Sequence, residues 1–105
     1  MRIVIVGAGN VGRSIARELT AHGHQILLID KNPKAMKPDT VPEAEWLCAD
    51  ACELATLEEA RIDNCDIAIS ATGDDKVNLV HSLLAKTEFG VPRTVARVTY
   101  THLRA

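Results

Sequence analysis

Six residues near the N-terminus form a glycine-rich loop of a kind that binds phosphate. The segment Gly7-Ala8-Gly9-Asn10-Val11-Gly12 has the spacing G-x-G-x-x-G and directly follows the apolar run 3–6. In this motif the first glycine permits a tight turn, and the second lacks the Cβ that would keep a pyrophosphate from the backbone. The third lets the following helix pack closely on the strand. Unpaired N–H groups and the helix dipole at the start of that helix then attract phosphate.

An acidic residue at the end of the next apolar run completes the pattern. Asp30 follows the run 26–29, at about the 20-residue interval expected for the acid that binds ribose. A carboxylate there accepts hydrogen bonds from both ribose hydroxyls and repels a 2′-phosphate, which disfavours NADP. Lys31, next to it, weakens that repulsion. Loop and acid together predict a site for an adenine nucleotide, either NAD(H) or ATP/ADP. The simpler alternative is a glycine turn beside an unrelated surface aspartate.

Short strands and helices in alternation must position these residues. Five segments are expected to be strands: 3–6, 26–29, 45–49, 67–69 and 95–98. All except 45–49 are continuous apolar runs, which are typical of strands buried on both faces. Helices are expected at about 11–22, 53–61 and 75–89, and prolines leave room for only a turn or so of helix between the second and third strands. This order implies a parallel sheet with right-handed crossovers. The predicted fold is α/β: one Rossmann-like, doubly wound parallel sheet in a three-layer α/β/α domain.

The helical periodicity also predicts which side chains face the core. In the helix 75–89 one face carries Val77, Val80, Leu83 and Leu84, and in the helix 53–61 the inward residues are Leu54, Leu57 and Ala60. His81 is expected at the surface or at an edge. Asp75 is expected to cap the helix that begins at Lys76, and Asn78 in its first turn to tie down the preceding loop.

Composition excludes several classes of function. The chain has 105 residues and a net charge of −2, so it is one small domain without the basic surface that nucleic acid or an anionic membrane requires. No apolar run approaches the roughly 20 residues that span a bilayer, so we expect no direct membrane insertion. Three cysteines, an odd number, favour reduced thiols and the cytoplasm. Cys48 and Cys52 have no second ligand pair for zinc, and no metal site is expected.

Three later segments indicate a family. They are Ala49-Asp50-Ala51-Cys52, the cluster T-G-D-D-x-x-N that begins at Thr72, and Val95-Ala96-Arg97-Val98. Together with the glycine loop and Asp30 they resemble the N-terminal nucleotide-binding domain of the TrkA family, also called the RCK or KTN domain. Those proteins are regulatory subunits of bacterial potassium uptake systems. The resemblance covers residues 1–98, and 99–105 are left as a tail of uncertain origin.

The resemblance implies a role for each matching residue. The loop residues Gly7, Ala8, Gly9, Asn10, Val11 and Gly12 would hold the phosphates, and Asp30 with its neighbour Lys31 would lie at the ribose. Asp50 and Ala51 would lie beside the adenine, although Asp50 also suits a solvated loop. Thr72 and Gly73 would border the second ribose or the terminal phosphates. Arg97, on the fifth strand, would lie near the phosphates or a dimer contact.

The resemblance further implies a regulatory binding module rather than an enzyme. Its partners would be a membrane potassium transporter subunit and further copies of itself, as a dimer or higher homo-oligomer, at the cytoplasmic face of the cell membrane. The rival interpretation is an NAD-dependent oxidoreductase or a fragment of one, but the chain has no Tyr-x-x-x-Lys pair and little room for a substrate. A third is the cytoplasmic domain of a potassium efflux antiporter or channel.

Overall fold

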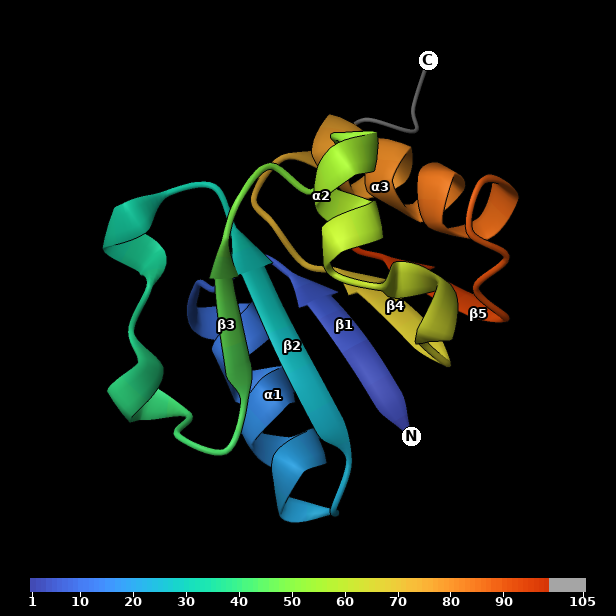
Figure 1. Cartoon of the computed structure of the whole chain (residues 1–105). Coiled ribbons are helices and arrows are strands. Elements are labelled where there is room, and N and C mark those ends of the chain that lie inside the picture. Colours follow the sequence, from blue (N-terminus) through green and yellow to red (C-terminus); the bar gives the residue numbers. More distant parts are fainter. Residues whose placement is uncertain (99–105) are drawn as a thin grey trace.

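Five parallel strands form one sheet in the computed structural model, which describes residues 1–98. The strands are β1 (Arg2–Val6), β2 (Gln25–Asp30), β3 (Glu45–Cys48), β4 (Ile67–Ser70) and β5 (Arg93–Ala96). Their order across the sheet is β3-β2-β1-β4-β5 (Figure 1). The helices are α1 (Asn10–Ala21), α2 (Leu54–Glu59) and α3 (Asp75–Thr87). The expected doubly wound α/β fold is confirmed.

Each face of the sheet has its own apolar core, and this explains the unbroken apolar runs of the strands. Ile3 and Ile5 of β1 pack with Ala16 of α1 on one face. Val4 and Val6 pack with Leu57 of α2 and Ala85 of α3 on the other. Alternate side chains of a strand point to opposite faces, so a strand covered on both faces needs apolar residues at every position. The domain therefore has three layers, with α1 on one side and α2 and α3 on the other (Figure 1).

The topology creates a crevice where β1 and β4 lie side by side. Val6 pairs with Ser70 there, at the carboxyl ends of both strands. The chain leaves β1 toward β2 and β3, and then returns across the sheet to β4. The connections after β1 and β4 consequently run to opposite faces of the sheet. Ligands of open α/β sheets bind at such a switch point.

Between β2 and β3 the proline-rich segment forms two 3₁₀ turns, η1 (Pro33–Ala35) and η2 (Pro38–Thr40), in place of a full crossover helix. This confirms the expectation of only a turn or so of helix in that connection. A third such turn, η3 (Ile62–Asn64), leads into β4. Within residues 1–98 no helix is both long and apolar enough to cross a membrane.

The expected inward face of α3 is only partly right, because Leu84 packs against the core but most of the fully buried side chains are polar. Its buried residues are Asp75, Asn78, His81 and Ala85. The apolar side chains Val80 and Leu83 are instead 45% and 62% exposed. The helix is rotated because Asn78 and His81 hydrogen-bond to backbone groups of neighbouring loops, and those bonds allow polar side chains to be buried. The expectation that His81 lies at the surface is wrong for the same reason.

Smaller corrections concern single residues. Asp74, rather than Asp75, caps α3, and its carboxylate accepts hydrogen bonds from the N–H groups of Lys76 and Val77. Leu54 is exposed at the start of α2, whereas Leu57 and Ala60 are buried as expected. The fifth strand begins two residues before the apolar run 95–98, because its pairing with β4 starts opposite Ile67.

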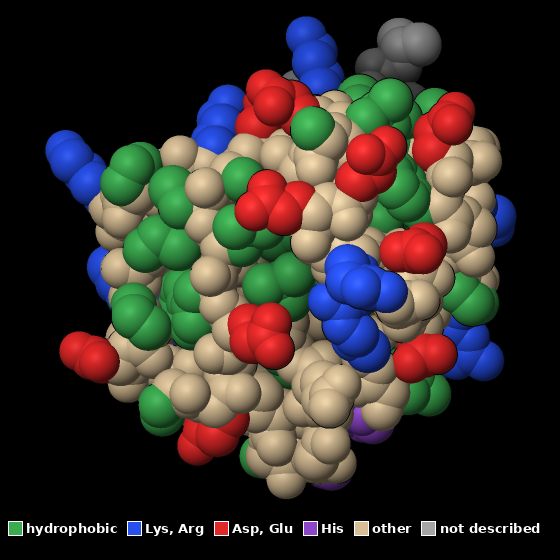
Figure 2. All heavy atoms as spheres, viewed as in Figure 1, with side chains coloured by type: hydrophobic (Ala, Val, Ile, Leu, Met, Phe, Trp, Pro, Cys, Tyr) green, Lys and Arg blue, Asp and Glu red, His purple; other side chains and the backbone are tan. Residues whose placement is uncertain are grey.

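The face that carries α2 and α3 has acidic side chains spread among basic and apolar ones (Figure 2). Nucleic-acid-binding surfaces gather one sign of charge into a basic patch or stripe. This face has no such basic stripe, which agrees with the net charge of −2 for the whole chain.

Candidate functional site

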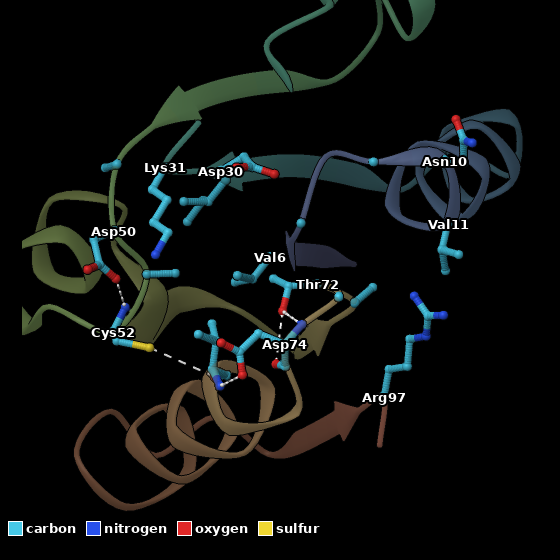
Figure 3. A pocket seen from close by; sticks show the side chains of 18 residues that line it. Val6, Asn10, Val11, Asp30, Lys31, Asp50, Cys52, Thr72, Asp74 and Arg97 are labelled. Carbon is cyan, nitrogen blue, oxygen red and sulfur yellow. Dashed lines mark hydrogen bonds between the residues drawn. The ribbon is translucent and has the colours of Figure 1, made fainter. Parts of the chain in front are cut away.

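A cavity of about 600 Å³ opens at the carboxyl ends of the strands, above the switch point (Figure 3). Every strand contributes to its wall, either directly or through the loop that follows it. The lining residues are Val6, Gly7, Gly9, Asn10, Val11, Ile29, Asp30, Lys31, Ala49, Asp50, Ala51, Cys52, Ala71, Thr72, Gly73, Asp74, Val77 and Arg97. Pockets for small molecules and cofactors occupy roughly 300–1,000 Å³, so the cavity is large enough for a nucleotide.

The three glycines of the loop do not have the same role. Gly7 has φ +105°, and a Cβ there would lie 2.9 Å from the backbone of Ala71 and Thr72. At Gly12 a Cβ would lie 1.7 Å from the carbonyl oxygen of Gly7. Gly9 faces open space: apart from its chain neighbours, no atom of residues 1–98 lies within 4 Å of the position of a Cβ. The first and third glycines are thus needed for packing, whereas the second leaves the backbone accessible to a ligand.

The start of α1 presents donors to this cavity. Gly9 occupies the N-cap position, and no side chain among residues 1–98 accepts a hydrogen bond from the first turn. The first N–H groups of a helix have no partner within the helix. Beside Gly9 they are suited to bind an anion such as phosphate.

Asp30 is held at the end of β2 by backbone donors. Its Oδ2 accepts a hydrogen bond from the N–H of Ala8 at 3.0 Å, and its Oδ1 accepts one from the N–H of Asn32 at 2.9 Å. The first bond joins the acid directly to the glycine loop. A carboxylate has about four lone-pair sites, so each oxygen can still accept a hydroxyl. This is the arrangement needed to bind a ribose diol.

The loop between β3 and α2 forms a second wall. Asp50 accepts a hydrogen bond from the N–H of Cys52 at 2.9 Å, and Ala51 is buried. The Cys52 thiol lies 3.8 Å from the carbonyl oxygen of Val77 and donates to it. Burial, with a smaller contribution from Asp50, raises the pKa of Cys52, so the thiol remains protonated and a donor. The side chains of Lys31 and Asp50 lie on this side of the cavity (Figure 3).

Asn78 fixes the opposite wall. Its Oδ1 accepts hydrogen bonds from the backbone N–H of Thr72 at 3.0 Å and from the Thr72 hydroxyl at 2.6 Å. Its Nδ2 donates to the carbonyl oxygens of Thr72 at 3.0 Å and Arg97 at 2.8 Å. The side chain is fully buried and does not line the cavity. Asn78 thereby ties the loop after β4 to the end of β5. The sequence predicted its attachment to the loop.

Most of the residues singled out from the sequence meet in this cavity; Ala8 and Gly12 do not line it. Ala8 acts through its N–H on Asp30, and Gly12 permits the close approach of α1. Arg97 follows β5 directly rather than lying on it, and its side chain extends toward Val11 (Figure 3). Sequence reasoning missed Cys52 in the loop after β3, Asp74 in the loop after β4 and Val77 in the first turn of α3.

The lining is rich in groups that bind a polar ligand. Among residues 1–98 it presents the carboxylates of Asp30, Asp50 and Asp74, the cations of Lys31 and Arg97, and backbone donors, and no histidine or tyrosine of that range lines it. Within residues 1–98, no cluster of three or more His, Cys, Asp or Glu side chains is arranged to hold a metal ion.

Comparison with solved structures supports the fold. The Kef CTD of Shewanella denitrificans in an AMP-bound form superposes with a TM-score of 0.72 and 20% identity, over 90% of this chain and 57% of that one. A Thermus thermophilus UDP-glucose 4-epimerase in complex with NAD gives a TM-score of 0.71 and 21% identity, over 90% of this chain and 36% of that one. Similarity at this level of identity extends to the fold alone.

Sequence comparison is more specific. Trk system potassium uptake protein TrkA of Mycobacterium tuberculosis is 55% identical over 98 residues, which are 93% of this chain and 44% of that protein. The TrkA homolog of Methanothermobacter thermautotrophicus is 37% identical over 101 residues, 94% of this chain and 46% of that protein. The chain thus spans less than half the length of these relatives. The family model of the TrkA-N domain matches residues 3–104, and the chain therefore belongs to the TrkA-N domain family.

Proposed function

We propose that this domain is the nucleotide-sensing part of a bacterial potassium uptake system, and that it binds NAD(H) or ATP/ADP in the cavity above the switch point. One observation carries the proposal. Asp30 and the open backbone of Gly9 line the same cavity, and the Ala8 N–H donates to the Asp30 carboxylate. A diol acceptor beside an uncapped helix start matches the ribose and pyrophosphate of an adenine dinucleotide or diphosphate.

In this proposal the remaining lining residues on the two walls of the cavity contact different parts of the nucleotide. The adenine lies against Asp50 and Ala51, and the second ribose or the terminal phosphates lie against Thr72 and Gly73. Arg97, on the side of the cavity opposite Lys31 (Figure 3), supplies positive charge at the phosphate end. An additional 2′-phosphate would lie beside the Asp30 carboxylate, so NADP(H) binds more weakly than NAD(H).

The domain acts by regulation, without catalysing a reaction. Its relatives are named as Trk system potassium uptake proteins, and we assign it a membrane potassium transporter subunit as partner, at the cytoplasmic face of the membrane. A nucleotide regulates such a partner only if it binds two arrangements of the domain with different affinities. Hydride transfer from NADH to an added carbonyl substrate would contradict this part of the proposal.

The exposed apolar side chains of α3 support self-association. Leu79, Val80 and Leu83 are 48%, 45% and 62% exposed. Clusters of exposed large apolar side chains mark contact surfaces. We assign this surface to the contact with a second copy of the chain, as a homo-dimer or a higher oligomer.

Calorimetric titration with ADP, ATP, NADH and NADPH tests nucleotide binding. Asp30→Ala should abolish binding, because the ribose acceptor is lost. Gly9→Ala should weaken binding by at least tenfold while the protein stays folded, because the added methyl group meets no protein atom but occupies the space of the phosphates. If wild-type protein bound none of the four ligands, or if both variants bound them as wild type does, the assignment of this cavity would be wrong.

A further inference from the structure

One polar side chain lies beneath the cavity wall and is not explained by packing alone. His81 of α3 is fully buried. Its Nδ1 lies 3.1 Å from the carbonyl oxygen of Ala51. Its Nε2 is also buried and has no hydrogen-bond partner among the described residues. A leucine of similar size would fill the same space without burying an unsatisfied nitrogen, so the bond to Ala51 is the feature that requires histidine.

The tautomer of His81 follows from this contact. A carbonyl oxygen only accepts hydrogen bonds, so Nδ1 must carry the proton. Burial lowers the pKa of His81, against a smaller opposing contribution from the bond to Ala51. The ring is therefore neutral, with Nδ1 as donor and Nε2 as a bare acceptor.

The hydrogen bond from His81 orients one peptide unit in the cavity wall. The Ala51 carbonyl and the Cys52 N–H belong to the same planar trans peptide and point in opposite directions. His81 holds the carbonyl on the side of α3. On the other side, the N–H of the same peptide donates to Asp50 Oδ1 at 2.9 Å. Rotation of this peptide would release both hydrogen bonds at once.

We propose that His81 is a positioning residue of the nucleotide site, which acts through the Ala51–Cys52 peptide to hold the Asp50 carboxylate where it meets the base. This inference rests on the proposed function, because Asp50 and Ala51 are the residues assigned to the adenine. His81 itself does not line the cavity. Its loss should affect ligands that carry a base more than ligands that carry only ribose and phosphate.

Three substitutions distinguish this role from packing. In His81→Asn the amide nitrogen is as many bonds from Cβ as Nδ1 is, so it can still donate to Ala51. In His81→Gln the amide lies one bond further out, at the position of Nε2, and His81→Leu removes the donor. Ala85→Gly is the matched control, because Ala85 is buried one turn further along the same face of α3, does not line the cavity and has no side-chain hydrogen bond to lose.

The affinities of all four variants for ADP and for ribose 5-phosphate are measured by calorimetry, and their folding is checked by urea unfolding. We expect His81→Leu and His81→Gln to weaken ADP by at least about tenfold, His81→Asn to stay within about threefold of wild type, and ribose 5-phosphate to be unaffected. Ala85→Gly should lower stability but leave the ADP affinity of the folded protein unchanged.

The outcomes separate the two proposals. If wild type binds ADP and His81→Leu binds it equally well, or if Asn rescues no better than Gln, the positioning role is overturned while the proposed function stands. If wild type binds neither ADP nor NADH, both fail. Should His81→Leu not fold, the ¹⁵N shifts of the His81 ring in wild type decide: a neutral ring protonated on Nδ1 supports the role, and one protonated on Nε2 overturns it.

Discussion

Asn78 offers the sharpest test of how the cavity wall is held, because one isosteric substitution removes half of its hydrogen bonds. Asn78→Asp keeps the size of the side chain and the acceptor that Thr72 uses. It replaces the amide NH₂ with an oxygen that faces the carbonyl oxygens of Thr72 and Arg97. An ionised carboxylate would then lie fully buried against two carbonyl groups.

The magnitude follows from the cost of that charge. Full burial raises the pKa of a carboxyl by up to about 3–5. We take a rise of about 3, the low end of this range, because the N–H and O–H of Thr72 both stabilise the ionised carboxylate. The folded-state pKa is then about 7, against about 3.9 in the unfolded chain. At pH 7 this costs about 4 kcal/mol, and the hydrogen bond that a protonated carboxyl cannot replace costs about 1 kcal/mol more.

The sign of the pH dependence is fixed by the raised pKa. Below about pH 3 the carboxyl is protonated in both states, so only the lost hydrogen bond matters. As pH rises toward the folded-state pKa, the unfolded chain loses its proton first, and the variant loses about 1.4 kcal/mol of stability per pH unit relative to wild type. Between about pH 4.5 and 6.5 the difference should grow by about 2.4 kcal/mol.

Urea unfolding measures this difference, followed by the fluorescence of Trp46, the single tryptophan, which packs against the core on the α1 face. Asn78→Ala is the control, since it loses all four hydrogen bonds but cannot titrate. Its destabilisation should be independent of pH. A pH-independent difference for Asn78→Asp as well would refute the inference that a buried amide donor at this position holds the two carbonyl groups.

Three further predictions concern other residues. Gly12→Ala should lower the free energy of unfolding by about 3 kcal/mol or more, because its Cβ would overlap the Gly7 carbonyl oxygen. Gly9→Ala should change it by less than about 1 kcal/mol. Urea unfolding of both variants measures the two changes. Burial lowers the folded-state pKa of His81 below its usual value of 6.5. As pH falls below 6.5, the unfolded chain therefore takes up a proton before the folded protein does, and wild type should lose stability. In the same unfolding series, His81→Asn should not show this loss of stability. If the stability of both proteins fell equally with decreasing pH, the folded-state pKa of His81 would not be lowered. Leu83→Lys should shift the sedimentation of any oligomer toward monomer while the domain stays folded, because Leu83 is exposed, and equal sedimentation of the two proteins would exclude the exposed face of α3 as the contact.

The sequence predicted the parts of the site that depend on local patterns. The glycine spacing, the acid that ends β2 and the alternation of strands and helices are each properties of a short segment. The rule that parallel strands bring their carboxyl ends together then assembled most of the cavity. Cys52, Asp74 and Val77 were missed. The same rule could have found them, because they lie within a few residues of assigned positions.

The orientation of α3 could not be predicted in this way. Its apolar periodicity points Val80 and Leu83 inward, and the structure leaves both exposed. Periodicity records only how apolar each position is. It does not record that the Asn78 amide meets two carbonyl groups from distant loops, or that His81 meets the carbonyl of Ala51. Buried polar side chains are recognised only when their partners are known, and those partners are brought near by the tertiary fold.

The two faces of α3 connect the cavity with the surface of the domain. Its buried face holds one wall of the cavity through Asn78 and the other through His81, while its opposite face exposes Leu79 and Leu83. A displacement of the helix would therefore move both walls together. A nucleotide that fits only one position of the walls selects that position of α3, and a partner that fits the exposed face only in the same position selects it too. Because such coupling is reciprocal, each would strengthen the binding of the other, without any contact between them.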